Sequence, residues 1–136
     1  MDLPSDLSLV EAVVSYLAGR CRDFGFDGVR LDLNFRVSVT EALVNAVLYG
    51  NRSDREKTVR VEMRLAPGHL RVTVIDQGPG FDPARVPDPT LPENLGAPGG
   101  RGLFLIRHLM DRTEFLDRGN IVRMTLVHSG PESGSA

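Results

Sequence analysis

Residues 28–48 read GVRLDLNFRVSVTEALVNAVL, and the structure of this stretch decides the fold. Its first half alternates strictly between apolar and polar residues from Leu31 to Val39, which is typical of a strand. The same residues also fit a helix that continues to Leu48, and the second half has no Gly or Pro and is rich in helix formers. We therefore predict one long helix from about Gly28 to Leu48.

A further helix is expected before this one. Apolar residues recur at steps of three and four from Leu7 to Cys21, which is typical of one helical face. Ser5 or Asp6 can cap the start of this helix, and Gly25 can end it. The apolar stripe indicates that the helix packs on a core.

Two β-hairpins and a third helix complete the predicted elements. The strands of the hairpins cover residues 59–65 and 70–75, then 113–116 and 121–127. Pro67-Gly68 turns the first hairpin, and its alternating residues leave one face solvated. The third helix covers residues 102–110, where apolar residues again share one face. Antiparallel strands with helices gathered on one face predict an α+β two-layer sandwich.

A segment rich in Pro and Gly separates the two halves of this pattern. Residues 77–101 favour neither helix nor strand, because both residue types disrupt regular structure. The tail, residues 129–136, is small and polar and is predicted to be disordered. A chain of 136 residues fits one domain, which we place at residues 4–128.

Composition excludes several functional classes. The formal net charge is −2, which argues against a protein that binds nucleic acid through its phosphates. The single cysteine, Cys21, excludes an intramolecular disulfide and argues against a cysteine zinc cluster. No signal peptide and no membrane-spanning apolar run is visible. We expect a soluble, cytoplasmic protein without membrane or direct nucleic-acid partners.

The first candidate cluster lies in the long predicted helix. Glu41 and Asn45 are four residues apart, so they project from one helical face. A carboxylate can accept a proton, and an amide oxygen can bind a hard cation such as Mg²⁺. The pair also fits an ordinary solvated face. However, it interrupts a helix of Ala, Leu and Val, where a buried polar group costs free energy unless it has a partner. Tyr49 and Asn51 follow in the same segment.

The second cluster, Asp76-Gln-Gly78-Pro-Gly80-Phe81, directly follows a predicted strand. The Asp76 carboxylate can accept a hydrogen bond from an exocyclic amine such as that of adenine, and the glycines allow a flat ligand to approach. An ordinary turn after a strand explains the same residues.

The third cluster leads into the third helix and consists of Gly99, Gly100, Arg101, Gly102 and Leu103. Glycines before a helix expose several N–H groups to an anion, which the helix dipole favours. Arg101 adds a positive charge. A flexible hinge with a helix cap explains these glycines equally well.

Together and in this order, the three clusters resemble the N, G1 and G2 boxes of the Bergerat-type (GHKL) ATP-binding fold. Thr40–Ala46 with Tyr49-Gly50 resembles its serine-kinase branch, the anti-sigma-factor kinases, and so does Gly102–Ile106 followed by Met110-Asp111. The resemblance extends over nearly the whole chain. It implies a histidine-kinase-like ATPase sandwich with a mixed, mainly antiparallel sheet.

The resemblance also implies a set of ligands and residue roles. ATP and Mg²⁺ would bind, with Asn45 holding the metal, Glu41 acting as base and Asp76 binding the adenine amine. Residues 82–98 would close as a lid. The remaining positions implied to bind the nucleotide are Tyr49, Asn51, Gly78, Gly80, Gly99, Gly100, Arg101, Gly102 and Leu103.

The implied function is an ATP-dependent serine/threonine-protein kinase that phosphorylates a serine on a STAS-type anti-anti-sigma protein and binds a sigma factor. Two alternatives are a nucleotide-regulated binding module without transfer activity and the ATP-binding half of a histidine kinase. The carboxylate of Glu41 argues against the first, since binding alone needs no base. No dimerisation helix with a phosphoacceptor His precedes the domain, which argues against the second.

The sequence departs from the family pattern in three places. Only Met1–Pro4 precede the first helix, so the family's extra N-terminal strand is expected to be short or missing, and a homodimer stays an open expectation. Gly119-Asn120 stands where relatives often have Gly-Thr near adenine. The lid contains no Lys, which leaves Arg101 as the nearest positive group for phosphates.

Overall fold

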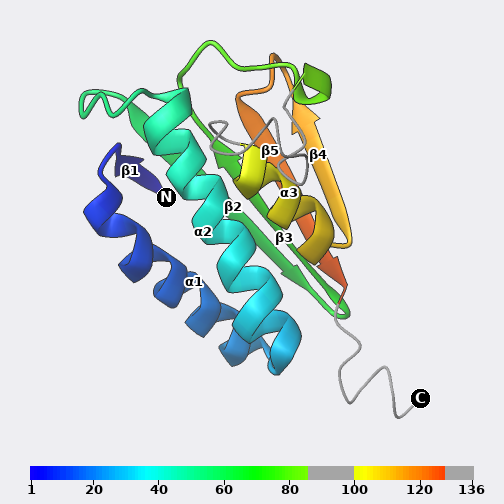
Figure 1. Cartoon of the computed structure of the whole chain (residues 1–136). Coiled ribbons are helices and arrows are strands. Elements are labelled where there is room, and N and C mark those ends of the chain that lie inside the picture. The colour runs from blue at the N-terminus through cyan, green and yellow to red at the C-terminus, as the bar shows by residue number, and fades with distance from the viewer. Residues whose placement is uncertain (86–99, 128–136) are drawn as a thin grey trace.

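The computed structural model describes residues 1–85 and 100–127 and forms two layers, with the helices packed on one face of a five-stranded sheet (Figure 1). The strands are β1 (Asp2–Pro4), β2 (Thr58–Ala66), β3 (His69–Ile75), β4 (Arg112–Leu116) and β5 (Ile121–Val127). The helices are α1 (Val10–Phe24), α2 (Arg36–Asn45) and α3 (Gly100–Leu109). The predicted α+β sandwich is confirmed.

The strand order is β1-β2-β3-β5-β4, and every pairing within the described ranges is antiparallel. A parallel pair, which a mixed sheet requires, does not occur in residues 1–85 and 100–127. Both predicted hairpins are present. The strand expected to be short or missing before the first helix is present as β1, whose three residues pair with β2.

The ambiguous stretch is helical. α2 is flanked by π-helical turns, η2 (Arg30–Phe35) and η3 (Ala46–Gly50), so one continuous helix runs over residues 30–50. Leu31 and Phe35 are fully buried, whereas Leu33 is 49% exposed. A strand would place all three side chains on one face, but a helix turns the middle one outward. The predicted helix is confirmed.

The helices begin and end close to the capping residues predicted from the sequence. A single 3₁₀ turn at Leu7–Leu9 precedes α1, and Asp6 caps it by accepting a hydrogen bond from the Ser8 N–H at 2.9 Å. Gly25 ends α1 in the left-handed conformation, with φ of 114°. α3 starts at Gly100, two residues earlier than predicted.

The Pro/Gly-rich segment holds one short helical turn, Pro83–Arg85, against the prediction of no helix. A proline in the first position of such a turn loses no hydrogen bond, because that N–H has no partner inside the turn. The rest of the expected lid, Gly99 and the tail fall outside the described residues.

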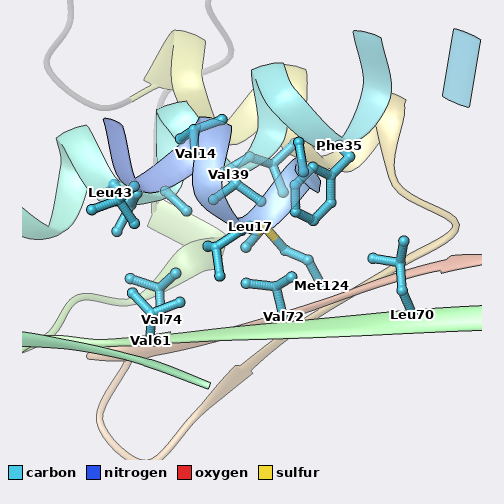
Figure 2. Packing of buried hydrophobic residues seen from close by; sticks show 14 of the residues in the cluster. Val14, Leu17, Phe35, Val39, Leu43, Val61, Leu70, Val72, Val74 and Met124 are labelled. Carbon is cyan, nitrogen blue, oxygen red and sulfur yellow. The ribbon is translucent and has the colours of Figure 1, made fainter. Parts of the chain in front are cut away.

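The core lies between the helices and the inner face of the sheet. Figure 2 shows side chains from the helices meeting side chains from β2, β3 and β5. The labelled residues are Val14, Leu17, Phe35, Val39 and Leu43 above and Val61, Leu70, Val72, Val74 and Met124 below. Within the described ranges, no helix combines the length and apolar character needed to cross a membrane.

Candidate functional site

A cavity of about 400 Å³ lies where the long helix, α3 and the ends of β3 and β5 meet. It is lined by Ala42, Asn45, Ala46, Tyr49, Gly50, Val74, Asp76, Gly80, Phe81, Asp82, Leu103, Ile106, Phe115, Gly119, Asn120 and Val122. Its size is typical of a small-molecule site, and mostly apolar walls carry a few polar groups. The cavity joins residues from all three clusters that the sequence singled out.

Asp76 supplies the carboxylate of this cavity. It follows β3, and its Oδ1 accepts a hydrogen bond from the Gly78 N–H at 2.8 Å. Burial raises the pKa of the Asp76 carboxyl above its usual range, and the Gly78 hydrogen bond opposes this effect. The charged form is therefore poorly solvated, which favours a ligand that donates a hydrogen bond to it.

Glycines bring backbone directly against this carboxylate. A Cβ on Gly50 would lie 2.4 Å from Cγ of Asp76, and a Cβ on Gly78 would lie 1.9 Å from the Gly50 carbonyl oxygen. Gly50 ends the π-helical turn η3, in which the Asn51 N–H donates to the Ala46 carbonyl at 2.8 Å. Such wide turns are frequent at functional sites. A side chain at either glycine would displace Asp76 or the helix end.

Glu41 and Asn45 converge on the first turn of α3. A Cβ on Gly102 would lie 2.8 Å from Oε2 of Glu41 and 3.0 Å from Nδ2 of Asn45. Neither side chain has a hydrogen bond or an ion pair to any described residue. The first N–H groups of a helix lack partners inside the helix and favour an anion. The Glu41 carboxylate, the Asn45 amide and the N-terminal end of α3 therefore lie next to one another.

Asn120 closes the far wall. The Asp76 N–H donates to the Asn120 carbonyl at 3.0 Å, and Nδ2 of Asn120 donates to the Asp76 carbonyl at 3.1 Å. Oδ1 of Asn120 is buried and has no hydrogen-bond partner in the described part of the chain. Phe81 and Phe115, packed edge to face with centroids 5.5 Å apart, form the apolar side.

The structure brings most sequence-predicted site residues together, but not all. Asn45, Tyr49, Asp76, Gly80 and Leu103 line the cavity. Glu41, Gly78 and Gly102 contact or adjoin these lining residues. Gly100 is buried and Arg101 is exposed, and neither lines the cavity. Gly99 lies outside the described residues.

Asn51, expected at the ligand, does not line the cavity. Its side chain is fully buried, and its Nδ2 donates to Oγ of Ser5 and to the Thr58 carbonyl, both at 2.9 Å. Its Oδ1 accepts from the Gln77 N–H at 2.7 Å. The amide thus joins the segment after β1 to the start of β2 and to the loop that follows β3.

Sequence reasoning missed several walls of the cavity. Phe81 belongs to the second cluster and follows Gly80 directly, so the sequence could have indicated that it lines the site. Phe115 and Val122 belong to the second hairpin, whose alternation predicted strands but no site. Asn120 was marked only as a departure from the family pattern.

Comparisons with known proteins show what this chain is similar to. The family model described as "Histidine kinase-like ATPase domain" matches residues 3–126. Serine/threonine-protein kinase BtrW of Bordetella bronchiseptica is 30% identical over 107 residues, covering 76% of this chain and 75% of that protein. Serine-protein kinase RsbW of Listeria monocytogenes is 30% identical over 129 residues, covering 90% of this chain and 80% of that protein.

Two solved structures share the fold. The RsbU and RsbW domains of a Mycobacterium tuberculosis protein match with a TM-score of 0.58 and 19% identity, over 94% of this chain and 31% of that longer one. A histidine kinase domain from a blue-light activated kinase of Erythrobacter litoralis matches with a TM-score of 0.54 and 20% identity, over 93% of this chain and 63% of that one. At these identities the likeness concerns the fold alone.

Proposed function

This chain belongs to the histidine kinase-like ATPase family, and we propose that it is an ATP-dependent serine/threonine-protein kinase of the anti-sigma-factor type. Its substrate would be a serine on a STAS-type anti-anti-sigma protein, and a sigma factor would be its second partner. The observation that carries the proposal is the convergence of Glu41 and Asn45 on the first turn of α3, beside the cavity that holds Asp76. A binding site alone does not need a carboxylate there that has no partner among the described residues.

The Asp76 end of the cavity suits adenine. A carboxylate only accepts hydrogen bonds when ionised, so it pairs with the exocyclic amine of adenine and repels the carbonyl that guanine carries at the same position. The backbone of Gly50 and Gly78 leaves room for a flat base edge against Asp76. Val74, Ile106 and Val122 supply apolar surface for the base.

The α3 end suits the phosphates. The first N–H groups of α3 would bind the phosphates, and Asn45 presents an amide without a hydrogen-bond partner among the described residues. Mg²⁺ takes oxygen ligands from one or two side chains together with substrate phosphates, which fits the single amide oxygen of Asn45. When bound, the ion would neutralise phosphate charge.

Glu41 would act as the base. As the serine hydroxyl oxygen attacks the γ-phosphorus, ADP leaves and the hydroxyl proton passes to the Glu41 carboxylate. Proton transfer of this kind contributes about 10²–10⁴ in rate. Glu41 has no ion pair in residues 1–85 and 100–127 that would have to be broken first.

The test is the Glu41→Gln variant, assayed with labelled ATP, Mg²⁺ and candidate STAS-domain proteins. Gln keeps size and helix propensity but cannot take a proton, so ATP binding should persist while single-turnover transfer falls by about 10²–10⁴. Glu62→Gln, an exposed carboxylate on β2, is the matched control and should transfer at the parent rate.

Transfer by the Glu41→Gln variant within a few-fold of the parent would remove Glu41 from the mechanism. A parent chain that binds ATP but transfers no phosphate to any candidate would favour the nucleotide-regulated binding module instead.

A further inference from the structure

The turn between β4 and β5 is interlocked with the loop that follows β3. We call residues 117–120 the β4–β5 turn and residues 76–81 the Asp76 loop. Two hydrogen bonds join Asp76 to Asn120, as described above. A third runs from Nε of Arg118 to the Gly78 carbonyl at 3.0 Å. The segment that carries the proposed adenine contact is therefore held by residues about 40 positions away in sequence.

The two segments also touch backbone to backbone. Gly80 has φ of 82°, and a Cβ there would lie 2.0 Å from the Arg118 carbonyl oxygen and 2.8 Å from its Cγ. Gly119 has φ of 94°, and a Cβ there would lie 2.0 Å from the Phe81 carbonyl oxygen. This packing restricts the Gly80–Phe81 end of the Asp76 loop, whereas hydrogen bonds restrain its Asp76–Gly78 end.

Arg118 differs from the other members of this contact because its side chain is half exposed. Its ion pair with Asp117 spans 3.4 Å at the surface, where such pairs contribute little. The side chain belongs to neither the apolar core nor the lining of the cavity. Its Nε–H nevertheless binds the same residue, Gly78, whose own N–H binds Oδ1 of Asp76.

We propose that Arg118 is a positioning residue for purine selection: its Nε–H fixes the Gly78 carbonyl and with it the Gly78 backbone, whose own N–H aims the Asp76 carboxylate at the purine amine. The inference rests on the proposed ATP-dependent function and adds a residue that acts on the base through Gly78. Without this hydrogen bond, the peptide between Gly78 and Pro79 is free to turn. The Gly78 N–H can then shift with it, and the Asp76 carboxylate no longer has one fixed direction. Purine discrimination should fall, whereas phosphate transfer from bound ATP should not.

Three variants separate the hydrogen bond from the charge of Arg118. Arg118→Gln places an amide nitrogen, Nε2, at the same number of bonds from Cα as Nε, so it keeps the donor and removes the charge. Arg118→Lys keeps the charge but has a methylene at that position. Arg118→Met removes both and keeps an apolar stem. Arg112→Gln, at the exposed first position of β4, is the matched control for loss of a surface arginine.

The measured quantities are the dissociation constants for ATP and GTP, and the single-turnover transfer rate at saturating ATP. We expect the preference for ATP to fall about three- to tenfold in the Lys and Met variants, the range expected for one hydrogen bond, and to change by less than about twofold in the Gln variant. The transfer rate at saturation should match the parent in all of them.

Several outcomes would overturn the inference. If the Met variant keeps the parent preference for ATP over GTP, Arg118 is dispensable. If the Lys variant keeps that preference and the Gln variant loses it, the charge of Arg118 is responsible and the hydrogen bond is not. Equal losses in Gln and Lys also contradict a role of the donor alone. A parent chain without any preference for ATP overturns the proposed function itself and this inference with it.

Discussion

The charge on Asp76 that would bind the ligand also lowers the folding stability of the protein. Burial raises its pKa, so the folded chain keeps the carboxyl protonated to a higher pH than the unfolded chain does. Folding stability associated with this group is therefore full below its usual pKa and is lost as pH rises through the raised value. At neutral pH the ionised carboxylate costs stability.

We predict that Asp76→Asn makes the nucleotide-free protein more stable at neutral pH. The amide carries no charge, and its Oδ1 can still accept the Gly78 hydrogen bond. The gain should shrink as pH is lowered from about 7 to about 4, because the parent carboxyl then becomes protonated and neutral too. Thermal unfolding across that range measures the gain.

The same variant should lose its preference for ATP over GTP, because an amide donates as well as accepts. Asp23→Asn, an exposed change on α1, is the control and should alter neither property. An Asp76→Asn protein that is less stable than the parent at pH 7 would contradict the assigned effect of burial.

At the same scale, the sequence predicted the positions of Asn45 and Asp76 but not the environment of Asn51. Residue type and spacing identify a polar side chain in an apolar helix or at a strand end. The hydrogen-bond partners of Asn51 are Ser5, Thr58 and Gln77. Ser5 and Gln77 are distant from Asn51 in sequence and reach it only through the tertiary fold. The sequence does not distinguish an asparagine whose amide hydrogen-bonds to distant parts of the chain from one whose amide is available to a ligand.

Among the elements, the long helix was predictable and its π-helical turns were not. Apolar spacing and the lack of Gly and Pro identify a helix over residues 28–48, but a single wide turn changes no residue type. The turn η3 places Gly50 against Asp76, so this contact between two predicted clusters could be found only in the structure.

A prediction at this scale concerns the first turn of α3. Alanine favours a helix over glycine by up to about 1 kcal/mol, so Gly102→Ala should not weaken the helix itself. Its Cβ, however, would lie 2.8 Å from Oε2 of Glu41 and 3.0 Å from Nδ2 of Asn45, so both side chains must move. We expect phosphate transfer to fall more steeply than ATP affinity, as measured by single-turnover assays and titration.

Gly19→Ala is the matched control, because Gly19 lies within α1 and nothing approaches its Cβ position within 4 Å. It should stabilise the protein by up to about 1 kcal/mol and leave transfer unchanged. Parent-like transfer by Gly102→Ala would show that the positions of Glu41 and Asn45 against α3 do not matter for the chemistry.

For the whole molecule, the order of helices and hairpins was predictable and the strand order was not. Each hairpin is local, but the pairing of β3 with β5 joins residues about 50 apart, such as Ile75 and Ile121. The inner-face pattern is the same for several strand orders. This pairing is what brings Asn120 beside Asp76 and closes the cavity.

The central strand β3 contributes side chains to both the core and the cavity. Substitutions at different positions of β3 can therefore separate the two roles. Val72 and Val74 both point to the helix face and are almost fully buried, but only Val74 also lines the cavity. Truncation of either removes two buried methyl groups, and each variant should lose about 2 kcal/mol of unfolding free energy.

ATP affinity should respond at one of the two positions only. Val74→Ala removes apolar surface that faces the base, so the dissociation constant for ATP should rise about three- to tenfold. Val72→Ala leaves the cavity wall intact, so its dissociation constant should match the parent well below the unfolding temperature. Urea unfolding and ATP titration on the same samples give both quantities. If Val72→Ala weakened ATP binding as much as Val74→Ala did, the loss would come from general loosening of the sheet, and the cavity would not be the place where the base binds.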